Sequence, residues 1–197
     1  MTGIPWAVER RPDTGVTNAT LGLWLFLAAE VMFFGSLVSA YALLRSGADG
    51  WPVQREVVRL PLGILDTLLL LGATAATLRA SRALHTGATA SYRGWTGAAL
   101  ALGAAFLGAS ALEWAGLVAR GQVPSASLFA GLYFTLTASH AVHLLGALAV
   151  SGYLLGPGAG LARLEPARYA HRIAVTAVYW QFVTAVWLVL VVLLYLL

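Results

Sequence analysis

The stretch that decides the fold is residues 21–44, LGLWLFLAAEVMFFGSLVSAYALL. It contains no Pro, Lys or Arg, and its one charged residue is Glu30. A helix of about 20 apolar residues is long enough to cross about 30 Å of bilayer hydrocarbon. We therefore predict that residues 21–44 span a membrane with Glu30 near the middle. An ionised carboxylate is costly at that depth, so Glu30 is expected to face protein, to pair, or to carry a proton.

The composition extends this prediction to the whole chain. Of the 197 residues, 59% are hydrophobic and 10% are charged, whereas a soluble domain carries about 25% charged residues. We therefore expect an integral membrane protein of the all-α class. The chain has no cysteine, which excludes disulfides and thiolate metal sites. Its basic residues are twelve Arg and no Lys, an excess that indicates membrane topology rather than nucleic-acid binding.

Five apolar stretches predict a five-helix transmembrane domain over residues 20–197, preceded by a polar N-terminal arm at residues 1–19. The predicted spans are 21–44, 62–84, 94–119, 127–155 and 173–197. The arm and the second and fourth links together hold eight Arg, and the first and third links hold four. Because cytoplasmic loops are enriched in Arg and Lys, this bias predicts an N-terminus inside and a C-terminus outside.

Two carboxyl groups and two histidines are the polar side chains of most interest within these spans. Apolar surroundings favour a protonated carboxyl, so Glu30 and Glu113 are candidates for a proton or lipid site, or for neutral hydrogen-bond donors. His140 and His143 are three residues apart and are expected on one helix face. The interpretation is an inward-facing polar set formed by these four residues.

Hydrogen bonds between helices are the simplest role for the other polar groups. We expect such contacts from His140, His143, Gln181 and Asp66. For Asp66, a position in the first turn of its helix, favoured by the helix dipole, is the alternative. The tryptophans expected to anchor the helices at the membrane interface are Trp51, Trp95, Trp114 and Trp180.

The histidine pair also raises the question of a metal. No Glu stands before either His at the spacing found in di-iron bundles, and HxxH is not the HExxH pattern of zinc proteases. We therefore predict no metal site and no directly bound cofactor, although the pattern leaves haem ligation open.

Five motifs in order resemble subunit III of the haem-copper oxidases. Residues 21–44 are similar to the family's LGxWxFLxSEVMFFxxLxxAY, and residues 60–84 to its LPLLNTxxLLxSSxTxxxAxxAL. Glu113–Trp114 resembles the EY or EW of the next helix, and LYFTLTASHAVHLLGAL at 132–148 resembles FFxxTGFHGLHVxxG. YWQFVTAVWLVLVVLLYL at 179–196 resembles YWHFVDxVWxxLxxxxYL. The chain looks like the short, five-helix bacterial form of this family.

The resemblance implies a non-catalytic subunit of a respiratory terminal oxidase in a bacterial cytoplasmic membrane. Its expected partners are the large subunit I, subunit II and a small subunit IV, with haems and copper in the partner subunits and phospholipid bound to this chain. Its expected role is to stabilise the large subunit and to aid proton uptake or access of oxygen and lipid.

The sequence departs from the family pattern in the last helix. Gln181 and Thr184 stand where the family usually has His and Asp, and Asp66 replaces a usual Asn. An accessory subunit of a quinol oxidase or of a nitric oxide reductase is therefore an alternative. A stand-alone proton-linked transporter is a second one, against which stands the absence of paired Gly/Pro-broken helices.

Overall fold

The computed structural model describes residues 10–52 and 54–197. Five helical segments in this part of the chain are long and apolar enough to cross a membrane. They are α1 (Asn18–Ser46), α3 (Leu60–His85), α4 (Thr89–Ala119), α5 (Leu128–Leu155) and α7 (Pro166–Val191), which continues as the π-helical turn η2 (Val192–Leu196). The described residues contain no strand, and the prediction of an all-α membrane bundle is confirmed. Of the predicted arm, residues 1–9 lie outside the described residues.

The links are more helical than the sequence indicated. They contain α2 (Gln54–Val57), the 3-10 turn η1 (Pro157–Gly160) and α6 (Leu161–Leu164). The helix of the last span begins at Pro166, before the predicted span start at residue 173, and a proline is tolerated in the first helical turn. Its charged first two turns, predicted as loop, are helical because a helix can continue beyond the hydrocarbon.

The third span also begins earlier than predicted, at Thr89 instead of residue 94. The link between α3 and α4 is therefore three residues long. Gly87 adopts a φ of +73° there, and the backbone N–H of Ala88 donates to the Ala83 carbonyl at 2.9 Å. This arrangement closes the end of α3 and turns the chain directly into α4.

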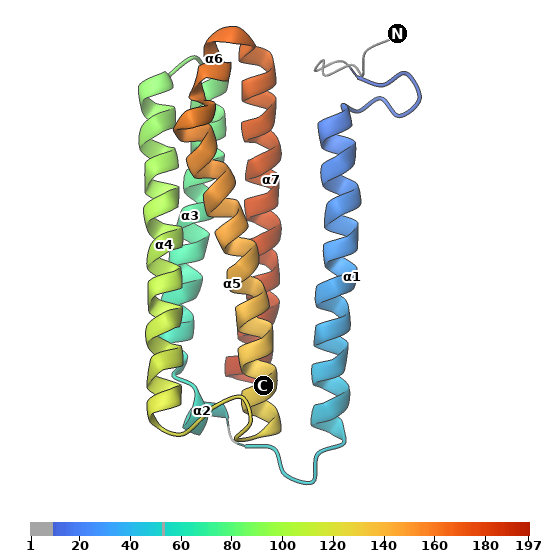
Figure 1. The fold of residues 1–197 in the computed structure, drawn as a ribbon, viewed down its shortest axis with the longest axis vertical. Helices are drawn as coiled ribbons and strands as arrows, with labels where there is room; N and C mark the ends of the chain where they lie inside the picture. Colours follow the sequence, from blue (N-terminus) through green and yellow to red (C-terminus); the bar gives the residue numbers. More distant parts are fainter. Residues whose placement is uncertain (1–9, 53) are drawn as a thin grey trace.

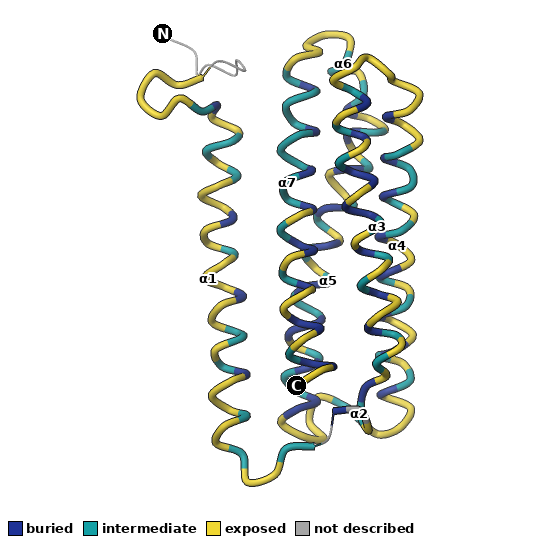
Figure 2. Tube along the Cα trace, turned by 180° about the vertical axis from the view of Figure 1, so that it is seen from behind, coloured by how far each residue is buried: buried dark blue, intermediate teal, exposed yellow. Residues whose placement is uncertain are grey.

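Helices α3, α4, α5 and α7 form a bundle, and α1 stands at its side, where it contacts α5 and α7 (Figure 1). The chain enters at one end of the bundle and finishes at the other (Figure 1). Buried residues lie on the facing sides of the bundle helices, while α1 is exposed along most of its surface (Figure 2). In the most apolar stretch of each helix, only 11% of α1 is buried, against 44% of α7. The position of α1 against the bundle therefore depends on a small number of contacts.

Small residues let the bundle helices approach closely. A Cβ added at Gly103 in α4 would lie 2.8 Å from the Trp180 ring and 2.9 Å from Leu148. At Gly63 in α3, an added Cβ would lie 2.8 Å from the ring of Tyr195. Such close approach is characteristic of helix packing in membranes, where dispersion contacts and hydrogen bonds replace the hydrophobic effect.

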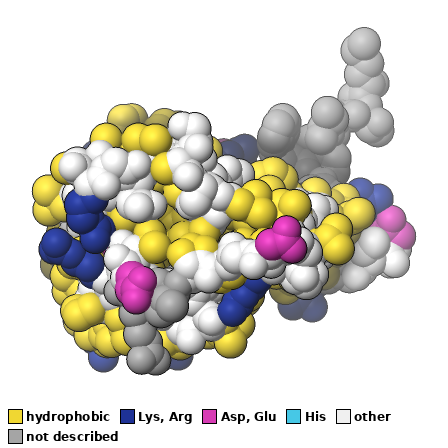
Figure 3. Space-filling view, turned by 90° about the horizontal axis from the view of Figure 1, so that it is seen from below, with side chains coloured by type: hydrophobic (Ala, Val, Ile, Leu, Met, Phe, Trp, Pro, Cys, Tyr) yellow, Lys and Arg dark blue, Asp and Glu magenta, His cyan; other side chains and the backbone are white. Residues whose placement is uncertain are grey.

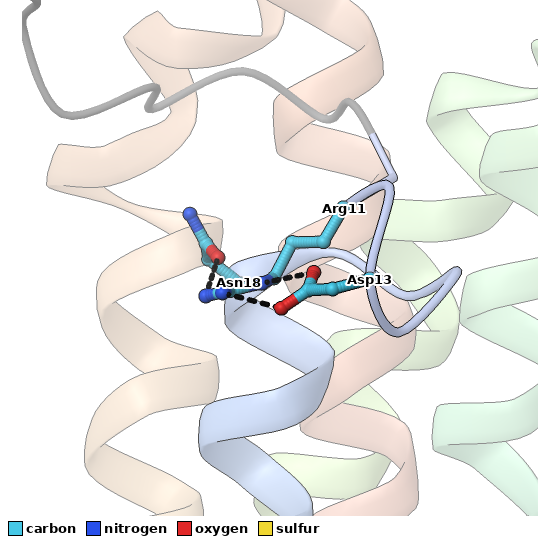
Figure 4. Close-up of polar contacts among 3 residues, drawn as sticks. All are labelled: Arg11, Asp13 and Asn18. Carbon is cyan, nitrogen blue, oxygen red and sulfur yellow. Dashed lines mark hydrogen bonds and ion pairs between the residues drawn. The ribbon is translucent and has the colours of Figure 1, made fainter.

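The two ends of the bundle differ in their charged side chains. At the α2 end, charged groups are scattered among apolar and neutral ones (Figure 3). At the other end, the Arg11 guanidinium binds both carboxylate oxygens of Asp13, at 2.9 and 2.8 Å. It also donates to Asn18, the first residue of α1, at 3.4 Å (Figure 4). These bonds hold the pKa of the exposed Asp13 carboxyl below its usual value.

Candidate functional site

Glu30 lies on the one face of α1 that meets the bundle. The buried residues of this helix, Leu27, Phe34 and Tyr41, are seven positions apart, and Glu30 falls between the first two on the same stripe. Its Oε2 lies 2.7 Å from Nε2 of His143 on α5. The two side chains are 16% and 15% exposed, so the contact is largely enclosed by protein in the middle of α1.

The hydrogen bonds of His143 fix the number of protons in this contact. Its Nδ1 lies 2.7 Å from the Ser139 carbonyl oxygen, which only accepts, so Nδ1 carries a proton. The contact between Nε2 and Oε2 then holds one proton, as a carboxylic acid beside a neutral imidazole or as a carboxylate beside an imidazolium. The pair has a net charge of zero in both arrangements. A pair without net charge is tolerated inside a membrane.

Aromatic rings surround the pair. The His143 ring lies 4.9 Å from the Phe34 ring and 5.9 Å from the Phe33 ring, measured between centroids. Tyr179 on α7 donates its hydroxyl proton to the His143 carbonyl at 3.1 Å. The pair is thus supported from α1, α5 and α7.

Further polar contacts hold α1 near each of its ends. Near its start, the Thr17 hydroxyl lies 2.7 Å from Nε2 of His171 on α7. Near its end, Tyr41 donates to the Leu193 carbonyl at 2.8 Å, and Gln54 donates to both of these oxygens. These partners could not be predicted from sequence, because they join segments up to 154 residues apart.

Glu113 belongs to a different cluster, which we call the tyrosine cluster and define as Glu113, Tyr133 and Tyr195. The two tyrosine hydroxyls lie 3.0 and 2.6 Å from Glu113 Oε2. The backbone N–H of Arg59 donates to Oε1 at 3.2 Å. Glu113 is therefore a buried acceptor that joins α4 to α5, to η2 and to the start of α3. A tyrosine partner is not recognisable from sequence, since tyrosine is common in apolar cores.

The expected single polar set is therefore wrong: the structure divides it into separate contacts. His140 binds a different helix from His143, because its Nε2 donates to the Val183 carbonyl of α7 at 3.0 Å. Asp66 accepts from Ser110 of α4 at 3.1 Å. Asp66 Oδ1 and His140 Nδ1 are buried without a partner among the described residues.

The last helix corrects two further expectations. Gln181 is exposed, and its amide donates to the Ala177 carbonyl of its own helix at 3.3 Å, with no hydrogen bond to another helix among the described residues. Trp180 is not an interface anchor: it is fully buried, and its indole N–H donates to Ser151. The Trp180 error follows from the early start of α7, which places this residue in the middle of the helix, and the Gln181 error follows from the rotation of the helix about its axis. Thr184 bonds Thr74 of α3 at 2.6 Å.

The other tryptophans lie nearer the helix ends. The Arg79 guanidinium lies 4.7 Å from the Trp95 ring centroid. Trp51 packs edge-on against Tyr41 and Phe129. The indole nitrogens of Trp51 and Trp114 are buried without a partner among the described residues. Interface anchoring by these three tryptophans stays a prediction.

Within residues 10–52 and 54–197, no three His, Asp or Glu side chains gather in a group that could hold a metal ion. The polar side chains at the centre of the molecule instead bind one another and the backbone across helices. The fold and these contacts define a class: a multi-pass α-helical membrane protein with buried polar contacts between its spans.

Comparison with known proteins gives the family. Residues 13–197 match the family model for cytochrome c oxidase subunit III, and the chain belongs to this family. The chain is 30% identical over 171 residues to the cytochrome bo(3) ubiquinol oxidase subunit 3 of Pseudomonas aeruginosa, covering 87% of this chain and 81% of the relative. It is 29% identical over 193 residues to the cytochrome c oxidase subunit 3 of a Bacillus species, covering 98% and 92%.

A third relative is the quinol oxidase subunit 3 of Bacillus subtilis, 29% identical over 185 residues, covering 92% of this chain and 87% of the relative. The chain is therefore a subunit of a haem-copper terminal oxidase, without a catalytic centre of its own. The nitric oxide reductase and transporter alternatives are not favoured.

Proposed function

We propose that this chain packs beside the large haem- and copper-bearing subunit of an oxidase, with subunit II and a small subunit IV, and stabilises the large subunit during turnover. The membrane is the cytoplasmic membrane of a bacterium, with the chain's N-terminus inside and its C-terminus outside. The eight arginines at the N-terminal end against four at the other support this orientation.

The observation that carries the proposal is the Glu30–His143 contact. In a bilayer, apolar surface gains little by packing on another helix instead of on lipid, so polar contacts decide where a loosely packed helix sits. This contact fastens α1 to the bundle while its outer face, with Trp24, Met32 and Leu43 more than half exposed, stays available to a partner subunit or lipid. A pair that holds one proton is also suited to proton exchange with the partner.

A lipid-binding role is supported by an apolar groove between α1, α5 and α7. One part, of about 470 Å³, is lined by Ala19, Tyr153 and Arg172. The next part, of about 310 Å³, is lined by Leu23, Phe26 and Tyr179, and both parts include Val150, Val175 and Thr176. The groove therefore runs from an arginine at the helix ends toward the rings around His143. It suits a phospholipid acyl chain with its headgroup near Arg172.

Purification by a tag on this chain tests the proposed assembly. We expect a complex with the absorption spectrum of haem and the large subunit in equal amount. A stable, haem-free assembly of this chain alone would contradict the proposal.

A further inference from the structure

A cavity of about 670 Å³ lies at the end of the bundle that carries α6. It is lined by the ends of α3 and α5, by the starts of α4 and α7, and by η1 and α6. None of its lining residues belongs to the groove between α1, α5 and α7. The cavity is therefore a second, separate feature, next to the α3–α4 turn (Figure 1).

Two arginines line this cavity, Arg93 on α4 and Arg163 on α6. No carboxylate is among the lining residues. The described acids at this end are engaged elsewhere, Asp13 with Arg11 and Glu165 with Arg168 at 3.0 Å. The positive charge of the cavity is thus not neutralised by a carboxylate of the part of the chain that the structure describes.

The two tyrosines in the cavity wall form their hydrogen bonds within the protein. Tyr169 donates to the Leu154 carbonyl at 2.7 Å, and Tyr92 therefore donates to the Tyr169 hydroxyl at 2.9 Å. Their protons are not available to a ligand, so the other polar side chains of the wall set the character of the site.

The start of α4 adds one further polar side chain. The backbone N–H groups of Thr89 and Tyr92 are already bonded, to the Gly87 carbonyl at 3.0 Å and to the Ala88 carbonyl at 2.9 Å. Thr89, which lines the cavity, also carries a side-chain hydroxyl. Together with the two arginines, this gives the cavity side-chain donors and positive charge.

We propose that this cavity binds a phosphate group, carried by the headgroup of an anionic phospholipid or by a free phosphate ion. Phosphate offers the acceptor oxygens and negative charge that guanidinium groups recognise. The position, at the ends of four spanning helices, is at the depth of lipid headgroups, and apolar residues such as Leu84, Leu155 and Pro166 complete the wall. The two sources of phosphate are distinguished by experiment.

The test is native mass spectrometry of the delipidated oxidase complex with added phosphatidylglycerol, phosphatidylcholine or inorganic phosphate. The test variant is the double substitution Arg93→Gln and Arg163→Gln. The control is Arg82→Gln, which removes one arginine charge from an exposed position at the same end outside the cavity wall. Loss of a charge-assisted hydrogen bond weakens binding about tenfold per arginine.

We expect the wild type and Arg82→Gln to retain one more phosphatidylglycerol than the double variant, with no such difference for phosphatidylcholine. That result supports the site with a lipid as the phosphate source. Inorganic phosphate that binds the wild type and not the double variant, with equal phosphatidylglycerol retention, supports the site with free phosphate as the source. If the double variant bound both probes as well as the wild type does, the proposal would be overturned. It would also be overturned if Arg82→Gln lost as much binding as the double variant.

Discussion

At the scale of single residues, the hydrogen bonds of His143 determine how many protons its contact with Glu30 holds. The Ser139 carbonyl holds the Nδ1 proton of His143, so one proton remains for the 2.7 Å contact with Glu30. A neutral hydrogen bond and an ion pair between these side chains differ only in which atom carries this proton. The contact therefore needs a donor at position 30 or at His143 Nε2, and it does not require a permanent charge.

This argument predicts different effects for two substitutions of Glu30. In Glu30→Gln the amide can donate to the neutral His143 Nε2, so we expect the thermal unfolding midpoint, assembly and electron transfer of the purified complex to stay near those of the wild type. Glu30→Ala leaves His143 Nε2 without a partner and should cost about 1–2 kcal/mol of stability. If Glu30→Gln were as destabilising as Glu30→Ala, the charge and not the hydrogen bond would hold the pair.

The Arg11–Asp13 contact predicts a pH dependence outside the membrane. The side-chain hydrogen bonds from Arg11 hold the pKa of Asp13 below the usual 3.8. A carboxyl with a lowered folded pKa contributes stability above the unfolded value and loses it as pH falls through the folded pKa. We therefore expect the contact to be unchanged from neutral pH to about pH 5 and to be released in stronger acid.

The measurement is a ¹³C NMR titration of the Asp13 side-chain carboxyl in the wild type and in Arg11→Gln. The substitution should raise the Asp13 pKa toward 3.8. An unchanged pKa in Arg11→Gln would show that Arg11 is not the cause of the shift.

The sequence patterns predict which polar residues lie within the spans, but they do not predict which residues these contact. Glu30 and His143 are conspicuous in apolar segments, yet their pairing depends on α1 lying against α5, which periodicity does not specify. The partners of Glu113 are two tyrosines that look like ordinary core residues. Gln181 and Trp180 were misplaced because both depend on the rotation and length of α7, and neighbouring helical residues point about 100° apart.

At the scale of helices, α1 is held by polar contacts near its start, middle and end, while the bundle helices are held by close packing. The packing is tightest where glycine meets a large ring, as at Gly103 against Trp180. The existence of five spans could be predicted from apolar runs. The helix ends could not, because helices α4 and α7 continue through polar residues beyond the hydrocarbon.

The close packing of the bundle helices predicts different effects for two glycine substitutions on α4. Gly103→Ala would place a Cβ 2.8 Å from Trp180 and 2.9 Å from Leu148, and we expect a loss of about 1–3 kcal/mol. Gly108→Ala meets nothing within 4 Å and should be neutral or slightly stabilising, since alanine favours helix. Thermal unfolding of the purified complexes measures both, and equal effects would contradict the packing described.

At the scale of the whole molecule, the chain is an apolar helical bundle with its arginines concentrated at one end and with the largely exposed helix α1 at its side. This form suits a subunit that is embedded among lipid and other membrane subunits. The exposed face of α1 and the groove beside it are the surfaces through which the chain is expected to act on its neighbours.

The most direct test of the stabilising role is oxygen consumption by the purified oxidase with and without this chain, followed over many turnovers. We predict equal initial rates, because the catalytic centre lies in other subunits, and a faster decline of activity in the complex that lacks the chain. The decline should slow again when the chain is added back. Equal persistence of activity in both preparations would contradict the account.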